Sequence, residues 1–262
     1  MSQRSLHQCR VVITGASSGV GRALAMEMAP YSTRLILVAR SEQPLAELTD
    51  ELTKRGAAAA EAIVGDVTDP AVRSRIVERV NELWGGLDIL VNNAGISTHA
   101  RFADSSEATL RKIMEVNFFA AAELTRQSLP MLRTGNDPLV VNVGSVLGHR
   151  GVPLNSEYSA SKFALRGWSE ALRAELSRDA VGVLVVSPGT IDTDFFDHLV
   201  ARAESMSWGK QKGISPEAAA RQIVRAIRLR RHEIYPNWRG RMLVWLNRCC
   251  PGLVDRLMSR YG

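Results

Sequence analysis

The sequence predicts an α/β fold with a doubly wound parallel sheet in a single domain, ending in an amphipathic helical tail. Three observations lead to this prediction. Short apolar runs alternate with longer helical stretches, a glycine cluster follows the first apolar run, and no linker or internal repeat interrupts the pattern. Regular alternation of strand and helix produces right-handed βαβ units and a parallel sheet with helices on both faces.

Six apolar runs are the predicted strands. The first of them is nearly unbroken in its apolar character, so we expect it to be buried on both faces. They cover residues 10–13, 34–39, 62–65, 87–91, 139–143 and 181–186. Helices are predicted between and after them at residues 22–29, 43–55, 70–84, 109–132, 158–177 and 215–230.

Length and composition are those of one globular domain. The chain has 262 residues, of which 45% are hydrophobic and 23% charged. Its three cysteines have no disulfide-framework spacing and its five histidines no metal-ligand spacing, so we expect a reducing compartment and no metal site. The first ten residues lack the apolar core of a signal peptide, and no run approaches the roughly 18 apolar residues that span a bilayer. These features predict a cytoplasmic protein.

Positive charge is concentrated at the C-terminal end. The net charge is +6, but the residues from Arg221 onward contain ten arginines, no lysine and only two acidic residues, Glu233 and Asp255. That segment therefore carries +8 and the remainder about −2. We divide the chain into a domain at residues 1–236 and a basic tail at residues 237–262.

The glycine cluster lies at the carboxyl end of the first predicted strand, where ligands bind in such sheets. Its residues are Gly15, Ser17, Ser18, Gly19, Val20 and Gly21. Gly15 permits a tight turn, Gly19 lets the backbone approach a pyrophosphate, and Gly21 lets the next helix pack against the strand. The serines add hydroxyl donors, and the helix N-terminus presents free N–H groups. The cluster predicts dinucleotide binding in a Rossmann fold, although a glycine-rich turn alone can be purely structural.

Arg40 follows the second predicted strand. A carboxylate at this place holds the ribose 2′-hydroxyl of NAD, whereas a guanidinium pairs with the 2′-phosphate of NADP. We therefore predict NADP(H) as the cofactor. The alternative is that Arg40 is an ordinary solvated surface residue.

Five motifs stand in register with the strand–helix pattern. They are Thr14-Gly15-x-x-x-Gly19-x-Gly21, Asn92-Asn93-Ala94-Gly95, Ser145, Tyr158-x-x-x-Lys162 and Pro188-Gly189. Together they closely resemble the short-chain dehydrogenase/reductase family, over roughly Arg10 to Tyr235. One departure is Gly144, where a serine often precedes the catalytic serine. The catalytic position itself, Ser145, is intact.

The resemblance implies an Asn-Ser-Tyr-Lys active site and a dinucleotide lying across the strand ends. The implied catalytic residues are Asn117, Ser145, Tyr158 and Lys162. Those implied to border the adenine and its ribose are Asp66, Val67, Asn92, Ala94 and Gly95. Those implied to lie along the nicotinamide and its ribose are Tyr158, Lys162, Pro188, Gly189, Ile191 and Thr193. The family also implies a homodimer or homotetramer.

The residue types suit proton transfer. Tyr158 and Lys162 are four residues apart at the start of a predicted helix and therefore share a face. A nearby ammonium and a positive nicotinamide are expected to lower the pKa of Tyr158 from its ordinary value of about 10. Ser145 would hydrogen-bond the substrate oxygen, as an oxyanion-hole donor does, and Asn117 would position a water that links Lys162 to solvent. Taken alone, a Tyr–Lys pair is more often a half-buried aromatic beside a solvated amine.

The stretch from Thr190 to Trp208 is expected to border the substrate. Its apolar and aromatic members are Phe195, Phe196, Leu199, Met206 and Trp208, and the expected neighbours after the catalytic serine are Val146, Leu147 and His149. No obvious clamp for a carboxylate or phosphate is present, although Arg150 and Lys210 lie nearby. We therefore predict an apolar ketone, aldehyde or secondary alcohol, of lipid-like, steroid-like or xenobiotic type. The alternative is that the aromatics pack a lid onto the domain.

The tail contains a basic amphipathic helix. Met242, Trp245, Leu246 and Cys249 follow helical spacing, and Arg241 and Arg248 share another face. Three interpretations are open: packing on the domain or a partner subunit, peripheral docking on anionic lipid, and nucleic-acid contact. No nucleic-acid-binding motif accompanies the charge, so we expect no nucleic-acid partner.

The sequence thus predicts hydride transfer between NADP(H) and an apolar carbonyl or alcohol, with Tyr158 as the acid/base. An NAD-linked alcohol dehydrogenase is the alternative that Arg40 disfavours. A non-catalytic NADP(H)-binding regulator or scaffold is the alternative that the intact set of four catalytic residues disfavours.

Overall fold

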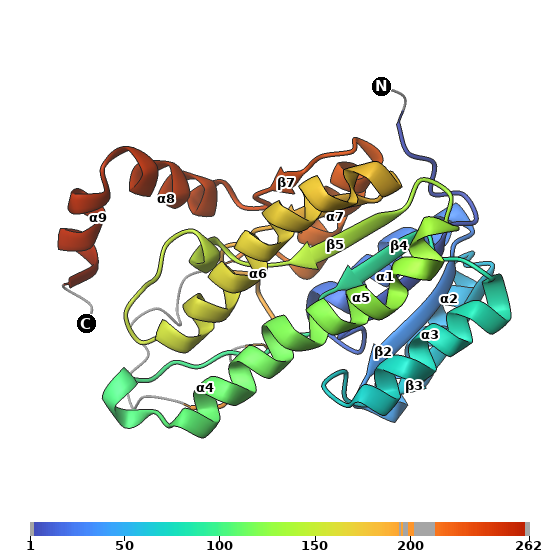
Figure 1. Ribbon diagram of the computed structural model, residues 1–262, viewed down its shortest axis with the longest axis horizontal. Helices are drawn as coiled ribbons and strands as arrows, with labels where there is room; N and C mark the ends of the chain where they lie inside the picture. Colours follow the sequence, from blue (N-terminus) through green and yellow to red (C-terminus); the bar gives the residue numbers. More distant parts are fainter. Residues whose placement is uncertain (1–2, 194, 196–198, 202–212, 260–262) are drawn as a thin grey trace.

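A computed structural model of the chain describes residues 3–193, 195, 199–201 and 213–259. Strands in this part of the chain form one parallel seven-stranded sheet in the order β3-β2-β1-β4-β5-β6-β7 (Figure 1). The order reverses between β1 and β4, and ligands bind at this switch point in doubly wound sheets. The predicted fold class is confirmed.

The strands reproduce most of the predicted apolar runs. They are β1 (Arg10–Thr14), β2 (Arg34–Ala39), β3 (Ala59–Val64), β4 (Ile89–Asn92), β5 (Leu139–Val143), β6 (Gly182–Val186) and β7 (Glu233–Ile234). Strand β3 is an edge strand and starts three residues before the predicted run. Its Glu61 is half-exposed and pairs with Arg79 at 2.6 Å. The two-residue β7 was not predicted, because it has no apolar run.

Helices connect the strands. They are α1 (Gly19–Met28), α2 (Glu42–Lys54), α3 (Pro70–Trp84), α4 (Glu107–Met114), α5 (Ala120–Arg133), α6 (Ser156–Glu175), α7 (Pro216–Arg228), α8 (Trp238–Cys249) and α9 (Pro251–Met258). Short 3-10 turns occur at η1 (Ala29–Tyr31), η2 (Phe102–Asp104), η4 (Val146–Gly148) and η5 (Leu176–Asp179). The predicted helix at 109–132 is divided, because α4 and α5 are joined by a π-helical turn, η3 (Glu115–Phe119).

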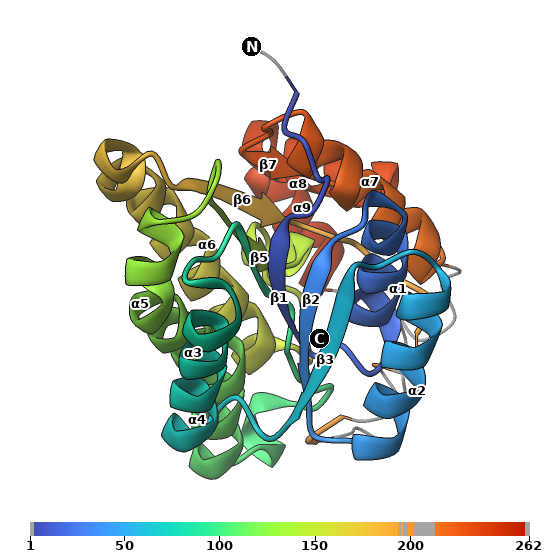
Figure 2. The same ribbon diagram turned by 90° about the vertical axis from the view of Figure 1, so that its right-hand side faces the viewer.

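Each face of the sheet has its own core. Helices α1, α2 and α7 cover one face and α3, α5 and α6 the other (Figure 2). Strand β1 shows the reason: Val11 and Ile13 enter the first core and Val12 the second, since successive side chains of a strand point to opposite faces. The strands are therefore rigidly held, and the turns at their carboxyl ends are fixed in place.

Membrane spans and metal clusters were searched over the described residues. None of their helices combines the length and apolar composition needed to cross a bilayer. No cluster of three or more His, Cys, Asp or Glu side chains in the same residues could hold a metal ion. Cys9 is buried, whereas Cys249 and Cys250 are exposed, and all three are free thiols.

Candidate active site

The glycine turn between β1 and α1 is one wall of the candidate site. Gly15 and Gly19 have φ angles of +64° and +51°, in the left-handed region that favours glycine. A Cβ at Gly15 would lie 2.9 Å from the Cα of Ala94, and one at Gly21 would lie 2.2 Å from the carbonyl oxygen of Gly15. Side chains at these positions would push the turn away from both α1 and the turn after β4.

The N-terminus of α1 is open toward this turn. Ser18 is the N-cap residue, and its side chain makes no capping hydrogen bond. Ser17 is half-buried and Ser18 exposed. Uncapped N–H groups and the positive end of the helix dipole favour an anion, so the turn fits the pyrophosphate of a dinucleotide. Thr193, in the loop after β6, closes over it, with its methyl carbon 3.3 Å from a Cβ built on Gly19.

Thr14 and Asn93 join the glycine turn to the turn after β4. The hydroxyl oxygen of Thr14 accepts hydrogen bonds from the backbone N–H groups of Asn93 at 3.0 Å and Ala94 at 3.1 Å. The side-chain amide of Asn93 donates to the carbonyl oxygens of Thr14 and Gly15, both at 3.0 Å. Neither residue was among the predicted site residues, although both stand inside the quoted motifs. Through these hydrogen bonds they hold the two turns together.

Asn92 differs from its neighbour. Its buried side-chain amide donates to Thr125 at 3.0 Å and to Asn142 at 2.8 Å, and Asn142 in turn donates to Ser169 at 2.8 Å. The side chain therefore lies inside the domain. Any contact of Asn92 with a ribose falls to its backbone.

The predicted adenine side lies beyond β2 and β3. Arg40 is exposed at the end of β2 and makes no hydrogen bond or ion pair with any other described residue. Asp66 follows β3, and its Oδ1 accepts from the N–H of Thr68 at 3.0 Å and from its hydroxyl at 2.8 Å. Val67 is buried. The guanidinium of Arg40 is thus available to an anion at the carboxyl end of β2.

Asn117 lies in the π-helical turn. Its Oδ1 accepts from the N–H of Ile96 at 2.9 Å, and its Nδ2 donates to the carbonyl oxygen of Ile96 and to Ser161, both at 2.9 Å. π-helical turns are frequent at functional sites, because they displace one side chain from the regular helical face. Asn117 therefore anchors the segment after β4 to α6. Its water-positioning role stays a prediction.

Three of the predicted catalytic residues meet at the carboxyl end of β5. Ser145 follows β5, and its Oγ donates to the carbonyl oxygen of Pro188 at 3.5 Å and accepts from the N–H of Leu147 at 3.1 Å. Its hydroxyl is near enough to Tyr158 to act on the pKa of that residue. The ammonium of Lys162 donates to the carbonyl oxygen of Val143 at 2.9 Å and lies 5.6 Å from the centre of the Tyr158 ring. All three side chains are buried. Gly95 lies close by, because a Cβ on it would be 3.6 Å from the Lys162 Nζ.

Burial dominates the acid–base properties of this cluster. It raises the pKa of Tyr158 to about 12, and the hydrogen bond to Ser145 opposes that rise only in part. Burial also lowers the pKa of Lys162 to about 8. In the chain on its own the pKa of Tyr158 is thus raised, and its expected lowering by the ammonium together with a positive nicotinamide stays a prediction. Tyr158 is a neutral acid in this state and can donate a proton.

The loop after β6 forms the predicted nicotinamide side. The carbonyl oxygen of Pro188 accepts from the N–H of Val146 at 2.9 Å, which ties this loop to the catalytic serine's turn. Ile191 pairs with Ile214 as an isolated parallel bridge. A Cβ on Gly189 would lie 3.2 Å from the side chain of Asn237. The loop is thus held by both the segment before α7 and the start of α8.

His149 does not face a substrate. Its buried Nε2 lies 2.9 Å from Glu233 Oε1 and 3.1 Å from the hydroxyl of Ser187. Burial alone would raise the pKa of Glu233, but hydrogen bonds from His149 and Tyr235 hold it below its usual value. This cluster braces the turn after Ser145 against β6 and β7. The expectation that His149 borders the substrate is therefore wrong.

Other predicted substrate-side residues have mixed outcomes. Phe195 contacts Tyr158 edge to face, with ring centres 6.1 Å apart, and Leu199 is half-buried. Arg150 is occupied by Asp255 at 2.7 Å and Asn247 at 3.3 Å, both in the C-terminal helices. The predicted residues Phe196, Met206, Trp208 and Lys210 lie outside the described residues.

The sequence model of the short chain dehydrogenase family matches residues 10–204. The chain belongs to this family. It is accordingly an oxidoreductase whose relatives bind nicotinamide dinucleotides.

Curated relatives match over nearly the whole chain. The ketoacyl reductase HetN of Nostoc sp. is 34% identical over 96% of this chain and 88% of its own length. The hydroxysteroid 11-beta-dehydrogenase 1-like protein A of Xenopus laevis is 34% identical over 100% of this chain and 89% of its own length.

Solved structures share the fold. A short-chain dehydrogenase/reductase from Burkholderia phymatum in complex with NAD has a TM-score of 0.85 at 25% identity, over 95% of this chain and 96% of its own. An alcohol dehydrogenase from Thermococcus sibiricus complexed with 5-hydroxy-NADP has a TM-score of 0.78 at 25% identity, over 87% and 95%.

Proposed function

We propose that this chain is an NADP(H)-dependent oxidoreductase that interconverts apolar ketones or aldehydes and their alcohols, with Tyr158 as the proton donor and acceptor. The buried cluster of Ser145, Tyr158 and Lys162 carries this proposal. It lies at the same edge of the sheet as the glycine turn that fits a pyrophosphate. A scaffold without chemistry would have no use for three polar side chains buried together, since burying them costs free energy.

Arg40 supports NADP(H) over NAD(H). It is exposed at the end of β2, it has no partner among the described residues, and no carboxylate takes the place where one would hold a 2′-hydroxyl. The two solved structures hold an NAD and an NADP derivative, respectively, so likeness to them does not decide between the two. The guanidinium of Arg40 favours NADP(H), because it attracts the 2′-phosphate that only this cofactor carries.

Each residue of the cluster has a distinct task in carbonyl reduction. When bound, the reduced nicotinamide supplies the hydride that adds to the carbonyl carbon. Ser145 donates a hydrogen bond to the carbonyl oxygen as negative charge develops there. Tyr158 transfers its hydroxyl proton to the same oxygen, which completes the alcohol and leaves a phenolate. The ammonium of Lys162 stabilises this phenolate, since opposite charges attract strongly in a buried site.

The described surroundings of Tyr158 favour an apolar substrate. Phe195 packs against its ring, and Val146 and Leu147 follow the catalytic serine. Arg150, a candidate clamp for an anionic substrate, is paired with Asp255 and is unavailable. A substrate carrying a carboxylate or phosphate would thus lose its water without gaining a cation from this side.

The test is initial-rate kinetics with NADPH and with NADH over a panel of apolar ketones and aldehydes. We expect turnover with NADPH, and Arg40→Ala should raise the KM for NADPH at least about tenfold while changing that for NADH little, because one charge-assisted pair is lost. Lys54→Ala is the matched control, since it removes one exposed positive charge from the far end of α2. Equal efficiency with NADH in the wild type would establish the NAD-linked alternative. NADPH binding without turnover anywhere in the panel would favour the regulator.

A further inference from the structure

The C-terminal helices α8 and α9 extend away from the sheet, beyond α6 (Figure 1). A few residues on the side of each helix that faces the domain hold the two helices in place. Val244 and Val254 are buried, and Asn247 donates to the carbonyl oxygen of His149 at 3.3 Å. Asp255 pairs with Arg150 at 2.7 Å. The inner side of the pair thus rests on the turn that follows the catalytic serine.

The remaining apolar residues of these helices are exposed. Trp238, Met242 and Trp245 have spacings of four and three residues, so they share one face of α8, and 69%, 54% and 64% of their surface is exposed. Leu253 and Leu257 are four residues apart on α9 and are 48% and 38% exposed. We call these five residues the tail surface. Three large apolar side chains exposed within two turns of α8, with two more exposed on α9, indicate an interaction surface, so the tail surface calls for a partner.

Charge identifies the partner. The exposed arginines of the two helices are Arg239, Arg241, Arg248 and Arg256. Asp255 is the single acidic residue in the whole segment 237–262, and Arg150 already neutralises it. Exposed tryptophan beside arginine is the composition of a helix that lies in the interface of a bilayer, with its aromatic rings at the level of the headgroups and its cations on anionic lipid.

A second copy of the chain suits this surface poorly. A two-fold dimer would bring the same patch from both copies together. The arginines of one copy would then face those of the other, and the segment contains no free carboxylate to separate them. Like charges at a contact oppose association. An anionic bilayer would attract these arginines, so no such repulsion arises.

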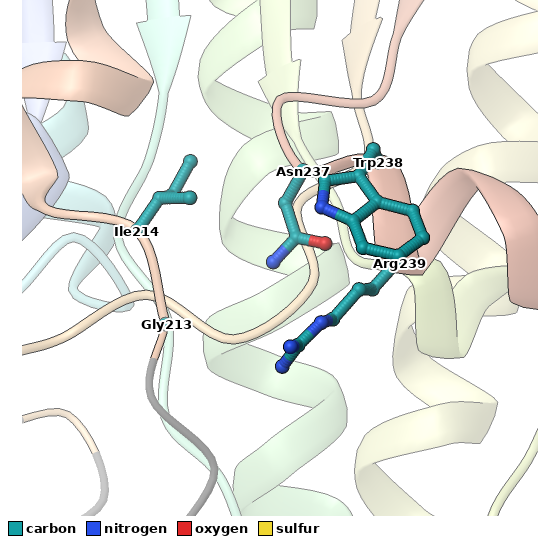
Figure 3. Close-up of a pocket in the computed structure, with 5 residues that line it drawn as sticks. All are labelled: Gly213, Ile214, Asn237, Trp238 and Arg239. Atoms are coloured by element: carbon teal, nitrogen blue, oxygen red, sulfur yellow. The ribbon is translucent and has the colours of Figure 1, made fainter.

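The tail surface also adjoins the substrate side of the enzyme. A hollow of about 230 Å³ lies between the segment 213–214 and the start of α8, lined by Gly213, Ile214, Asn237, Trp238 and Arg239 (Figure 3). The carbonyl oxygen of Thr190, in the loop after β6, accepts from the N–H of Ile214 at 3.2 Å and the amide of Asn237 at 3.4 Å. Trp238 therefore belongs to both the hollow and the tail surface.

We propose that the tail surface docks this protein on anionic lipid bilayers, with α8 and α9 lying in the interface and residues 187–193 on the side of the domain next to it. The docking does not depend on the proposed reaction. It brings the substrate side of the domain next to a phase in which apolar carbonyl compounds accumulate.

Co-sedimentation of the full-length protein with vesicles tests this proposal. We expect binding to vesicles of phosphatidylcholine containing phosphatidylserine, at least about tenfold tighter than to phosphatidylcholine alone and weakened by salt. The double variant Met242→Ala/Trp245→Ala should lose at least about tenfold in partitioning, because two large apolar side chains no longer enter the lipid. Phe102→Ala is the matched control, since Phe102 is equally exposed but lies on η2, outside the tail surface.

The charges are tested separately. Arg241→Gln/Arg256→Gln should abolish most of the preference for phosphatidylserine, whereas Arg111→Gln/Arg126→Gln, which removes two exposed arginines from α4 and α5, should not. Brominated lipids should quench the fluorescence of Trp238 and Trp245, which would show that they enter the bilayer. Equal binding by tail and control variants would overturn the proposal. So would absence of binding to either vesicle, or a dimer in sedimentation equilibrium that Met242→Ala/Trp245→Ala dissociates.

Discussion

The catalytic cluster and the tail surface depart from the usual distribution of polarity in opposite directions. In the cluster, the polar side chains of Ser145, Tyr158 and Lys162 are at most 9% exposed, whereas on the tail surface the two tryptophans are at least 64% exposed. Buried polar groups cost free energy unless they are hydrogen-bonded, and an exposed large apolar side chain forgoes about 1.5–3 kcal/mol of burial.

The two departures are compensated differently. Within the cluster, the chain itself supplies the partners, since Ser145 donates to the carbonyl oxygen of Pro188 and Lys162 to that of Val143. On the tail surface, the compensation has to come from outside the described chain. A buried polar cluster therefore indicates a site that is complete on folding, and an exposed apolar face indicates one that is completed by binding.

The sharpest test of this contrast compares Tyr158→Phe with Trp245→Ala. Removing the Tyr158 hydroxyl should lower kcat by at least about 10³-fold, because the proposed proton donor to the substrate oxygen is then missing. The free energy of unfolding of Tyr158→Phe should stay nearly unchanged, because a neutral buried hydroxyl is exchanged for a hydrogen. Trp245→Ala should leave both kcat in solution and stability nearly unchanged. Steady-state kinetics with urea unfolding measures both, and substantial turnover by Tyr158→Phe would remove Tyr158 from the mechanism.

A second prediction concerns pH and is of intermediate size. Since burial lowers the pKa of Lys162 to about 8, the folded chain releases this proton while the unfolded chain, with a pKa near 10.5, still holds it. Stability due to this group therefore rises with pH above about 8 and is lost as pH falls through 8. Relative to Lys162→Met, wild type should gain about 2 kcal/mol in the free energy of unfolding between pH 7 and pH 9.5.

Urea unfolding of the two proteins at both pH values gives this difference directly. Lys54→Met is the control, because Lys54 is exposed on α2 and should show no such change. A pH-independent difference between wild type and Lys162→Met would mean that water reaches Lys162 and that the cluster is less buried than its packing indicates.

The smallest expected effect concerns the ion pair between the two regions. Asp255→Asn removes the partner of Arg150, a pair whose aspartate side chain is 66% exposed. Such a pair contributes about 0–1 kcal/mol, so kcat should change less than about threefold. Hydrogen exchange of the α9 amides should nevertheless become faster, because Asp255 is a main attachment of that helix. Unchanged exchange would show that Val254 alone holds α9.

The sequence was sufficient to predict a residue's role where that role depends on the pattern of its neighbours along the chain. Strand β5 and helix α3 have the predicted bounds, and Gly15 has the positive φ angle of the tight turn predicted there. Apolar runs and glycine turns are determined by neighbours along the chain, so a single sequence displays them.

The sequence was insufficient where a role depends on which way a side chain points. Asn92 and Asn93 are adjacent and identical in type, but one faces the domain interior and the other the glycine turn, because successive side chains of a strand alternate. His149 turns inward because its partners Ser187 and Glu233 come from segments far along the chain. The pKa of Tyr158 depends on burial, which residue spacing does not reveal.

The π-helical turn between α4 and α5 limits how the chain can vary in length. An α-helix turns by about 100° per residue, so deleting one residue from 115–119 would let an ordinary helix run through and rotate α4 against α5 by about that angle. The amide of Asn117 would then leave Ile96 and Ser161. Surface loops of this enzyme can gain or lose residues freely, but the segment 115–119 has to keep its exact length.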